Sequence, residues 1–138
     1  IYTQEERYHG FLEAVEAHRP EIGITVIEDR QYLAALDALP LTGSKTAIMC
    51  SCDAYALEVL HYLRERRLRV PEDVGLIGFD HIDMLKYVQP QLTTVEYNVE
   101  LMGREAVRLL LERIEAGPGA AERREKIVEY AMIAGSSL

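Results

Sequence analysis

Three carboxylates stand at or within three residues of the ends of short apolar runs in this sequence: Glu28, Asp53 and Asp80. If those runs are parallel strands of one sheet, their carboxyl ends meet at the edge where open α/β sheets bind ligands. A carboxylate in that place can accept hydrogen bonds from sugar hydroxyls or from a ring N–H. We therefore expect Asp80 to contact a ligand, in preference to the Asx turn or helix cap that an aspartate after a strand also forms.

The same residues give little support to an enzyme or a metal centre. The sequence contains no G-x-G-x-x-G, no P-loop and no nucleophile elbow, so we expect no enzymatic activity and no cofactor. Carboxylates such as Glu28 and Asp53 are common at strand ends, and the four histidines lack metal-ligand spacing. We therefore predict no metal site.

Two cysteines, Cys50 and Cys52, flank Ser51 in the segment MCSCD. A strand would point both thiols to one face and Ser51 to the other. Such close neighbours form a disulfide only with difficulty, because the bridge requires a specific Cβ geometry. Zinc is not expected either, because no second pair of cysteines exists. The pair predicts reduced thiols in a cytoplasmic protein, with at least one at the edge of a site.

Helical and strand patterns alternate along the chain and predict an α/β fold, a parallel sheet flanked by helices. Asp53 is expected to be an N-cap. Because the chain opens on a helix, we expect a central strand to precede these residues, or its place to be filled by a second copy. The expected helices are 4–18, 31–39, 54–67 and 98–116, and the expected strands are 22–27, 46–50, 75–79, 92–95 and 127–133.

Charge and hydropathy exclude two classes of partner. The 138 residues carry a formal net charge of −8, whereas proteins bind DNA largely by neutralising phosphates with Lys and Arg. We therefore expect no direct DNA contact from this chain. No apolar run reaches membrane-spanning length, and the N-terminal residues lack the apolar core of a signal peptide.

Five motifs occur in a specific order: ERYHGFLEAV, TAIMCSCD, VPEDVGLIGFD, PQLTTV and MGREAVRLLLERIEAG. Together they resemble the effector-binding core of the LacI/GalR transcription regulators. The resemblance implies the C-terminal lobe of a periplasmic-binding-protein-like type I fold. It also implies three parts: residues 1–97 form the lobe, 98–117 a crossover helix that packs on the N-terminal lobe, and 118–138 a return strand.

The function implied by this resemblance is sensing of a small-molecule effector, a sugar or related metabolite, and dimerisation of a bacterial transcription regulator. Operator DNA would be bound by an N-terminal helix-turn-helix head outside these residues. Effector would shift the population between two lobe arrangements and so change the spacing of two heads. The alternative is the substrate-binding protein of a sugar ABC transporter, which shares the fold.

The resemblance also implies the effector-binding residues. Arg7 matches the arginine of the family's R-x-x-G-F pattern, and its planar fork of donors suits hydroxyl pairs or a carboxylate. Asp80 matches the acid of the G-F-D pattern. The sequence departs from the family at Cys52, Arg30, Tyr97 and His81. Cys52, Tyr97 and Arg30 are kept as site candidates, but their types point away from an ordinary hexose.

A dimer contact is implied for the helix that follows Asp53 and for the loop before PQLTTV. In this chain those positions are Leu57, Leu60, Tyr87 and Val88. The run ALEVLHYL has more apolar surface than one helix face can bury, which suits a contact between two copies. Plain core packing is the alternative, especially for Leu60.

Overall fold

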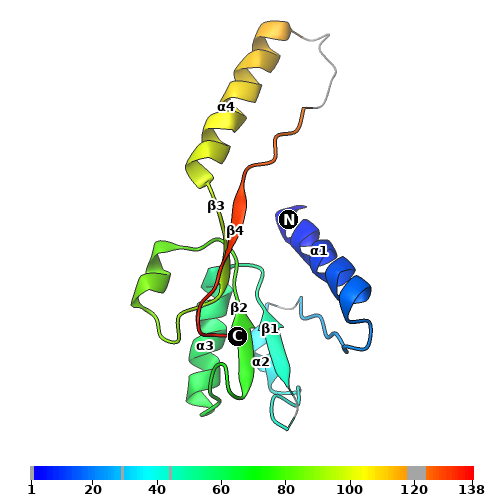
Figure 1. Ribbon diagram of the computed structural model, residues 1–138, viewed down its shortest axis with the longest axis vertical. Helices are drawn as coiled ribbons and strands as arrows, with labels where there is room; N and C mark the ends of the chain where they lie inside the picture. The colour runs from blue at the N-terminus through cyan, green and yellow to red at the C-terminus, as the bar shows by residue number, and fades with distance from the viewer. Residues whose placement is uncertain (1, 29, 44, 118–123) are drawn as a thin grey trace.

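The computed structural model describes residues 2–28, 30–43, 45–117 and 124–138 (Figure 1). Helices and strands alternate over most of the chain, as the sequence predicts for an α/β protein. The elements are α1 (Tyr2–His18), α2 (Tyr32–Leu36), β1 (Thr46–Met49), α3 (Asp53–Glu65), β2 (Val74–Ile77), the 3₁₀ helix η1 (Asp83–Tyr87), β3 (Thr94–Tyr97), α4 (Val99–Ala116) and β4 (Tyr130–Ile133).

A parallel pair of strands, β1 and β2, forms the centre of the fold. Thr46 pairs with Val74 and Met49 with Ile77, and a parallel bridge from Ile77 to Thr93 extends the pairing towards β3. Alternate residues of β2 are fully buried, as expected for a strand with period two. The carboxyl ends of β1 and β2 therefore lie side by side, which is where the sequence predicts a site.

Helix α3 supplies most of the apolar core. Ala56, Val59, Leu60 and Leu63 lie three or four residues apart and are almost inaccessible to solvent. Ala54 is exposed, so the buried stripe begins at Ala56. This face packs together with the buried residues of β2 and fixes the start of α3 beside the carboxyl ends of the strands.

A second, antiparallel pair joins β3 to β4 and leads into α4, which projects away from the rest of the fold (Figure 1). Asn98 caps α4 by accepting a hydrogen bond from the Leu101 N–H at 2.8 Å, and Gly117, at φ 73°, follows its last turn. None of its described residues is buried. Val99, Met102, Leu110 and Ile114 form an apolar stripe along α4 and are between 43 and 65% exposed.

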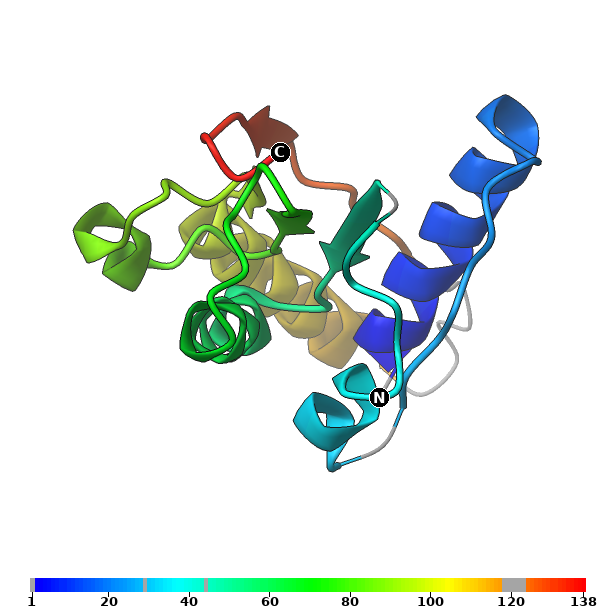
Figure 2. The same ribbon diagram turned by 90° about the horizontal axis from the view of Figure 1, so that it is seen from below.

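The prediction of a buried strand over residues 22–27 is wrong. Ile22, Ile24 and Val26 are between 40 and 52% exposed, and the segment forms no strand. Its β-branched composition favours an extended chain, but a strand also needs a neighbour for its N–H and C=O groups. Among the described strands, β1 pairs only with β2. In both views α1 and the segment after it lie on the β1 side of that pair (Figures 1 and 2).

The remaining predicted elements occur with altered bounds. The expected helix 31–39 is shorter in the structure and forms only α2, and the expected strand 127–133 is likewise shortened to β4. The extended stretch 92–95 begins and ends two residues later, as β3. Among the described residues, no helix has the length and the apolar composition needed to cross a membrane.

Candidate functional site

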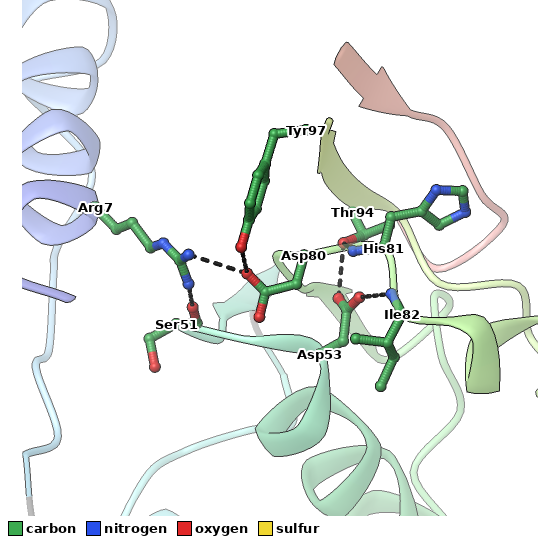
Figure 3. Close-up of polar contacts among 8 residues, drawn as sticks. All are labelled: Arg7, Ser51, Asp53, Asp80, His81, Ile82, Thr94 and Tyr97. Carbon is green, nitrogen blue, oxygen red and sulfur yellow. Dashed lines mark hydrogen bonds and ion pairs between the residues drawn. The ribbon is translucent and has the colours of Figure 1, made fainter. Parts of the chain in front are cut away.

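Arg7, Asp80 and Tyr97 come together from three separate elements (Figure 3). Arg7 lies on α1, Asp80 follows β2 by three residues, and Tyr97 ends β3. The Arg7 guanidinium donates from Nη2 to Asp80 Oδ1 at 3.0 Å, and the Tyr97 hydroxyl donates to the same oxygen at 3.0 Å. The sequence prediction that groups these three residues in one site agrees with this geometry, although their role towards a ligand stays a prediction.

The Arg7 guanidinium is held by two further contacts. Its Nη1 donates to the main-chain carbonyl of Ser51, two residues after the end of β1. Its central carbon lies 3.9 Å from the centre of the Phe79 ring, a cation–π contact. The Arg7 side chain is 15% exposed as a result, so the cation occupies a defined position between α1 and the sheet.

Tyr97 shares this partly desolvated environment. Burial raises the pKa of its hydroxyl, and the hydrogen bond to the Asp80 carboxylate raises it further, because both favour the protonated phenol. The Tyr97 ring lies 6.0 Å from the Phe79 ring, measured between centres. The phenol is therefore kept as a hydrogen-bond donor, and two aromatic faces border the charged pair.

Asp80 retains an acceptor that the described part of the chain does not use. Arg7 and Tyr97 both donate to Oδ1, and no donor among the described residues contacts Oδ2. The side chain is 25% exposed. A polar molecule with a hydroxyl or an N–H group could bind Oδ2 without breaking either existing bond.

The turn that carries Asp80 has an unusual backbone. Asp80 has φ 107° and His81 has φ 52°, both in a region that non-glycine residues rarely occupy. The Asp80 N–H donates to the Val95 carbonyl at 2.9 Å, which ties the turn to β3. Residues in such conformations persist only where their surroundings hold them. The position of the Asp80 carboxylate therefore depends on the residues that grip this turn.

The expectation that Asp53 caps α3 is wrong. Cys52 occupies the N-cap position, and the Asp53 carboxylate accepts hydrogen bonds from the Thr94 hydroxyl and from the Ile82 N–H (Figure 3). Asp53 is fully buried, so tertiary donors have replaced the helix N–H groups that an aspartate prefers at a helix start. Sequence reasoning also missed Ser51, which acts through its backbone, and Phe79, an apolar residue that reads as part of a strand.

The other site candidates make no hydrogen bond to Arg7, Asp80 or Tyr97 among the described residues. Cys52 is partly exposed and next to Ser51, with a free thiol that makes no capping bond. Arg30 is exposed, and no hydrogen bond or ion pair connects it to the described residues. The His81 ring faces Glu96 at 3.1 Å. Arg30 is therefore not brought into contact with Arg7 and Asp80.

The four residues expected at a dimer contact differ in how far they are exposed. Leu60 is 2% exposed and lies in the core of this chain. The expectation that Leu60 contacts a partner is therefore wrong, because its side chain has no free surface. Leu57 and Val88 are partly buried against the same core. Tyr87 is 77% exposed on η1 and is the best placed of the four.

The thiols and carboxylates also bear on metal binding. Burial raises the pKa of the Cys50 thiol to about 12, which keeps it protonated. Within the described ranges, no group of three or more His, Cys, Asp or Glu side chains is arranged to hold a metal ion.

The sequence and the fold match a known family. Residues 2–138 match the model of the periplasmic binding protein-like domain. The chain belongs to that family. The LacI/GalR resemblance is confirmed by a curated relative, the HTH-type transcriptional repressor PurR of Glaesserella parasuis serovar 5 (strain SH0165). It is 35% identical over 127 residues, which cover 82% of this chain and 35% of the relative.

Solved structures agree with the family match. A LacI-family transcriptional regulator from Sanguibacter keddieii superposes with a TM-score of 0.73 and 34% identity, covering 95% of this chain and 52% of that one. A LacI-family regulator from Enterococcus faecium with bound ribose gives a TM-score of 0.74 and 26% identity, covering 97% of this chain and 51% of that one. The chain thus spans about half of these structures and about a third of the curated relative.

Proposed function

We propose that this chain is the effector-binding part of a bacterial transcription regulator of the LacI/GalR type. The observation that carries the proposal is the Asp80 carboxylate, held by Arg7 and Tyr97 with one oxygen left unused by the described residues. The group lies at the carboxyl ends of parallel strands, the usual ligand position in α/β folds. The effector is a small polar molecule, a sugar or related metabolite.

Arg7, Asp80 and Tyr97 have distinct roles in this proposal. Asp80 Oδ2 accepts from a ligand hydroxyl or N–H, and Arg7 orients the carboxylate through its hydrogen bond to Oδ1. The Phe79 and Tyr97 rings provide flat apolar faces beside the polar groups, an arrangement typical of sites for polar ring compounds. Cys52 lies at the rim, and Arg30 remains a candidate contact that lies outside this group of three.

The whole regulator would join this lobe to a second lobe and to a DNA-binding head. Two features support a second lobe: the exposed apolar stripe of α4, and the larger size of the solved relatives. In this proposal residues 98–117 cross to the other lobe and residues 118–138 return from it, residues 118–123 lying outside the described ranges. The protein works in the cytoplasm, is not an enzyme, and binds operator DNA through its head.

A homodimer is also proposed, with Tyr87 at its centre and with Leu57 and Val88 beside it. Bound effector would favour one arrangement of the lobes and thereby change the spacing of the two heads. The transporter-protein alternative is not retained, because the relatives described above are repressors and regulators.

A ligand screen on the full polypeptide that carries this chain tests the proposal. Thermal unfolding is followed with D-ribose, other sugars, nucleosides and organic acids, because a ligand that binds only the native state raises the melting temperature. A compound that stabilises the protein is then titrated by calorimetry into Arg7→Met and Asp80→Asn. We expect each variant to weaken binding about tenfold or more, as for the loss of a charged hydrogen bond.

Two matched variants control for general damage. Arg19→Met removes an arginine just after α1 whose side chain is 71% exposed, and Asp83→Asn removes a fully exposed carboxylate three residues after Asp80. Both should bind as the unaltered protein does. Unchanged affinity in Arg7→Met and Asp80→Asn, or no stabilising compound in any of these classes, would contradict the proposed site.

A further inference from the structure

Asp53 is a buried acidic residue that connects three segments around the site. Its side chain is fully buried at the start of α3. Its Oδ1 accepts from the Thr94 hydroxyl at 2.7 Å, and its Oδ2 accepts from the Ile82 N–H at 2.9 Å. Its own N–H donates to the Phe79 carbonyl at 2.7 Å. A buried carboxylate is tolerated only with such donors, so these bonds hold α3, the turn after β2 and strand β3 together.

The turn to which Asp53 is hydrogen-bonded, residues 80–82, contains the two residues with left-handed backbone, Asp80 and His81. Successive N–H groups of this turn are all engaged: Asp80 with the Val95 carbonyl, His81 with the Thr94 hydroxyl at 3.4 Å, and Ile82 with Asp53. Two of these three bonds involve the pair formed by Asp53 and Thr94. Removing that pair would leave the strained residues Asp80 and His81 with one main-chain bond to β3.

The sheet leaves space for this carboxylate at one glycine. A Cβ placed on Gly78 would lie 2.1 Å from Asp53 Oδ1 and 2.9 Å from Leu92 Cδ2. Any side chain at position 78 would therefore push Asp53 away from Thr94. The close approach of the carboxylate to β2 depends on the missing side chain of Gly78.

We propose that Asp53 is a positioning residue for the effector site. Through Thr94 and Ile82 it fixes the turn 80–82 against β3, so that the Asp80 carboxylate meets Arg7 and the Tyr97 hydroxyl. Asp53 itself touches neither Arg7 nor Tyr97 in the hydrogen bonds of the described residues. The inference rests on the proposed function, because it assigns Asp53 to the same site.

Amide hydrogen exchange, measured by NMR on the full polypeptide without ligand, tests the inference. In Asp53→Ala we expect exchange at Asp80, His81 and Ile82 to accelerate at least tenfold more than exchange at Leu60 and Leu63 in the core of α3. A residue that acts only on global stability would accelerate both groups by the same factor. Equal acceleration, or no change at the turn, would overturn the proposal.

Three further variants keep the test valid if Asp53→Ala does not fold. Thr94→Val removes the hydroxyl with little change of volume and should also loosen the turn, whereas Thr94→Ser should restore its protection. Asp53→Asn keeps an oxygen for the Ile82 N–H and an amide that can donate to the Thr94 hydroxyl, so it should remain close to the unaltered protein. A turn equally loose in Thr94→Ser and Thr94→Val would contradict the role of the hydroxyl.

A second readout reports on the site itself. The phenol of Tyr97, followed by ¹³C NMR of labelled tyrosine and assigned with Tyr97→Phe, should titrate at lower pH in Thr94→Val than in Thr94→Ser, because Asp80 withdraws from it. An identical titration in both variants would count against positioning. None of these measurements uses an effector. Failure of the ligand screen would therefore refute the proposed function, whereas the exchange and titration data would still show whether Asp53 positions the turn.

Discussion

Arg7 and Asp80 are 73 positions apart in the sequence, and Arg7 Nη2 lies 3.0 Å from Asp80 Oδ1. This ion pair connects α1 to the carboxyl end of β2 in a partly buried setting, with the Arg7 side chain 15% and the Asp80 side chain 25% exposed. Segment 22–27, which follows α1, forms no strand with the sheet. The pair and the Ser51 carbonyl are therefore the principal polar attachment of α1 to the sheet among the described residues.

Replacement of Arg7 should consequently affect stability as well as binding. We expect Arg7→Met to lower the free energy of unfolding by about 1–3 kcal/mol, because Asp80 and the Ser51 carbonyl lose a charged donor. Urea unfolding at neutral pH measures the change. Arg19→Met should change it by less than about 0.5 kcal/mol, as is usual at exposed positions. Equal losses in the two variants would show that the pair with Asp80 contributes no special stability.

A pH-dependent contribution is expected from the ion pair between Arg69 and Asp73. Side-chain hydrogen bonds from Arg69, followed by its backbone N–H, lower the pKa of Asp73 from 3.8 to about 2. The folded state therefore binds this proton more weakly than the unfolded chain does. The stabilisation is complete above about pH 3.8 and is lost as pH falls towards 2.

NMR titration of the Asp73 carboxyl checks this prediction directly. Arg69→Gln should return the pKa of Asp73 towards 3.8, because it removes the bidentate donor that contacts both carboxylate oxygens. Arg104→Gln, on the exposed face of α4, should leave the pKa of Asp73 unchanged. An Asp73 that titrates near 3.8 in the unaltered protein would contradict the geometry of the pair.

Local patterns predicted the interior of the lobe well. The three-to-four spacing of apolar residues in the helix after Asp53 indicated a buried stripe that begins at Ala54 or at Ala56 and continues through Leu60 and Leu63. The structure buries the stripe that begins at Ala56. The apolar run 75–79 indicated a strand, which occurs as β2. These elements are determined by periodicity, which can be read from neighbouring residues in the sequence.

Long-range partners could not be predicted in the same way. Residues 22–27 have the composition of a strand, but composition does not show whether a neighbouring strand is present. Asp53 has the type and place of an N-cap, and only the folded chain shows Thr94 and Ile82 beside its carboxylate. The grouping of Arg7 with Asp80 came from the family resemblance, because no local pattern connects a helix to a turn so distant in sequence.

Tyr87 should control association if the proposed homodimer forms through η1. Tyr87→Ala removes an aromatic side chain that is 77% exposed, and we expect it to weaken dimerisation at least tenfold, since exposed aromatics are frequent anchors of interfaces. Sedimentation equilibrium of the full polypeptide measures the change. Tyr130→Ala removes a tyrosine of similar exposure, 75%, from β4 and should leave the dimer intact. A dimer equally strong in both variants would exclude Tyr87 from the interface.

The two glycines Gly78 and Gly103 should respond in opposite ways to alanine. In Gly78→Ala the new Cβ collides with Asp53 and Leu92, so we expect a loss of about 1–3 kcal/mol in the free energy of unfolding, typical of overpacking. In Gly103→Ala, within α4, the Cβ meets no atom within 4 Å, and higher helix propensity should add about 0.5–1 kcal/mol. Urea unfolding of both variants measures the difference. A neutral Gly78→Ala would mean that the Asp53 carboxylate can leave its place beside β2 without cost, which its two hydrogen bonds and complete burial argue against.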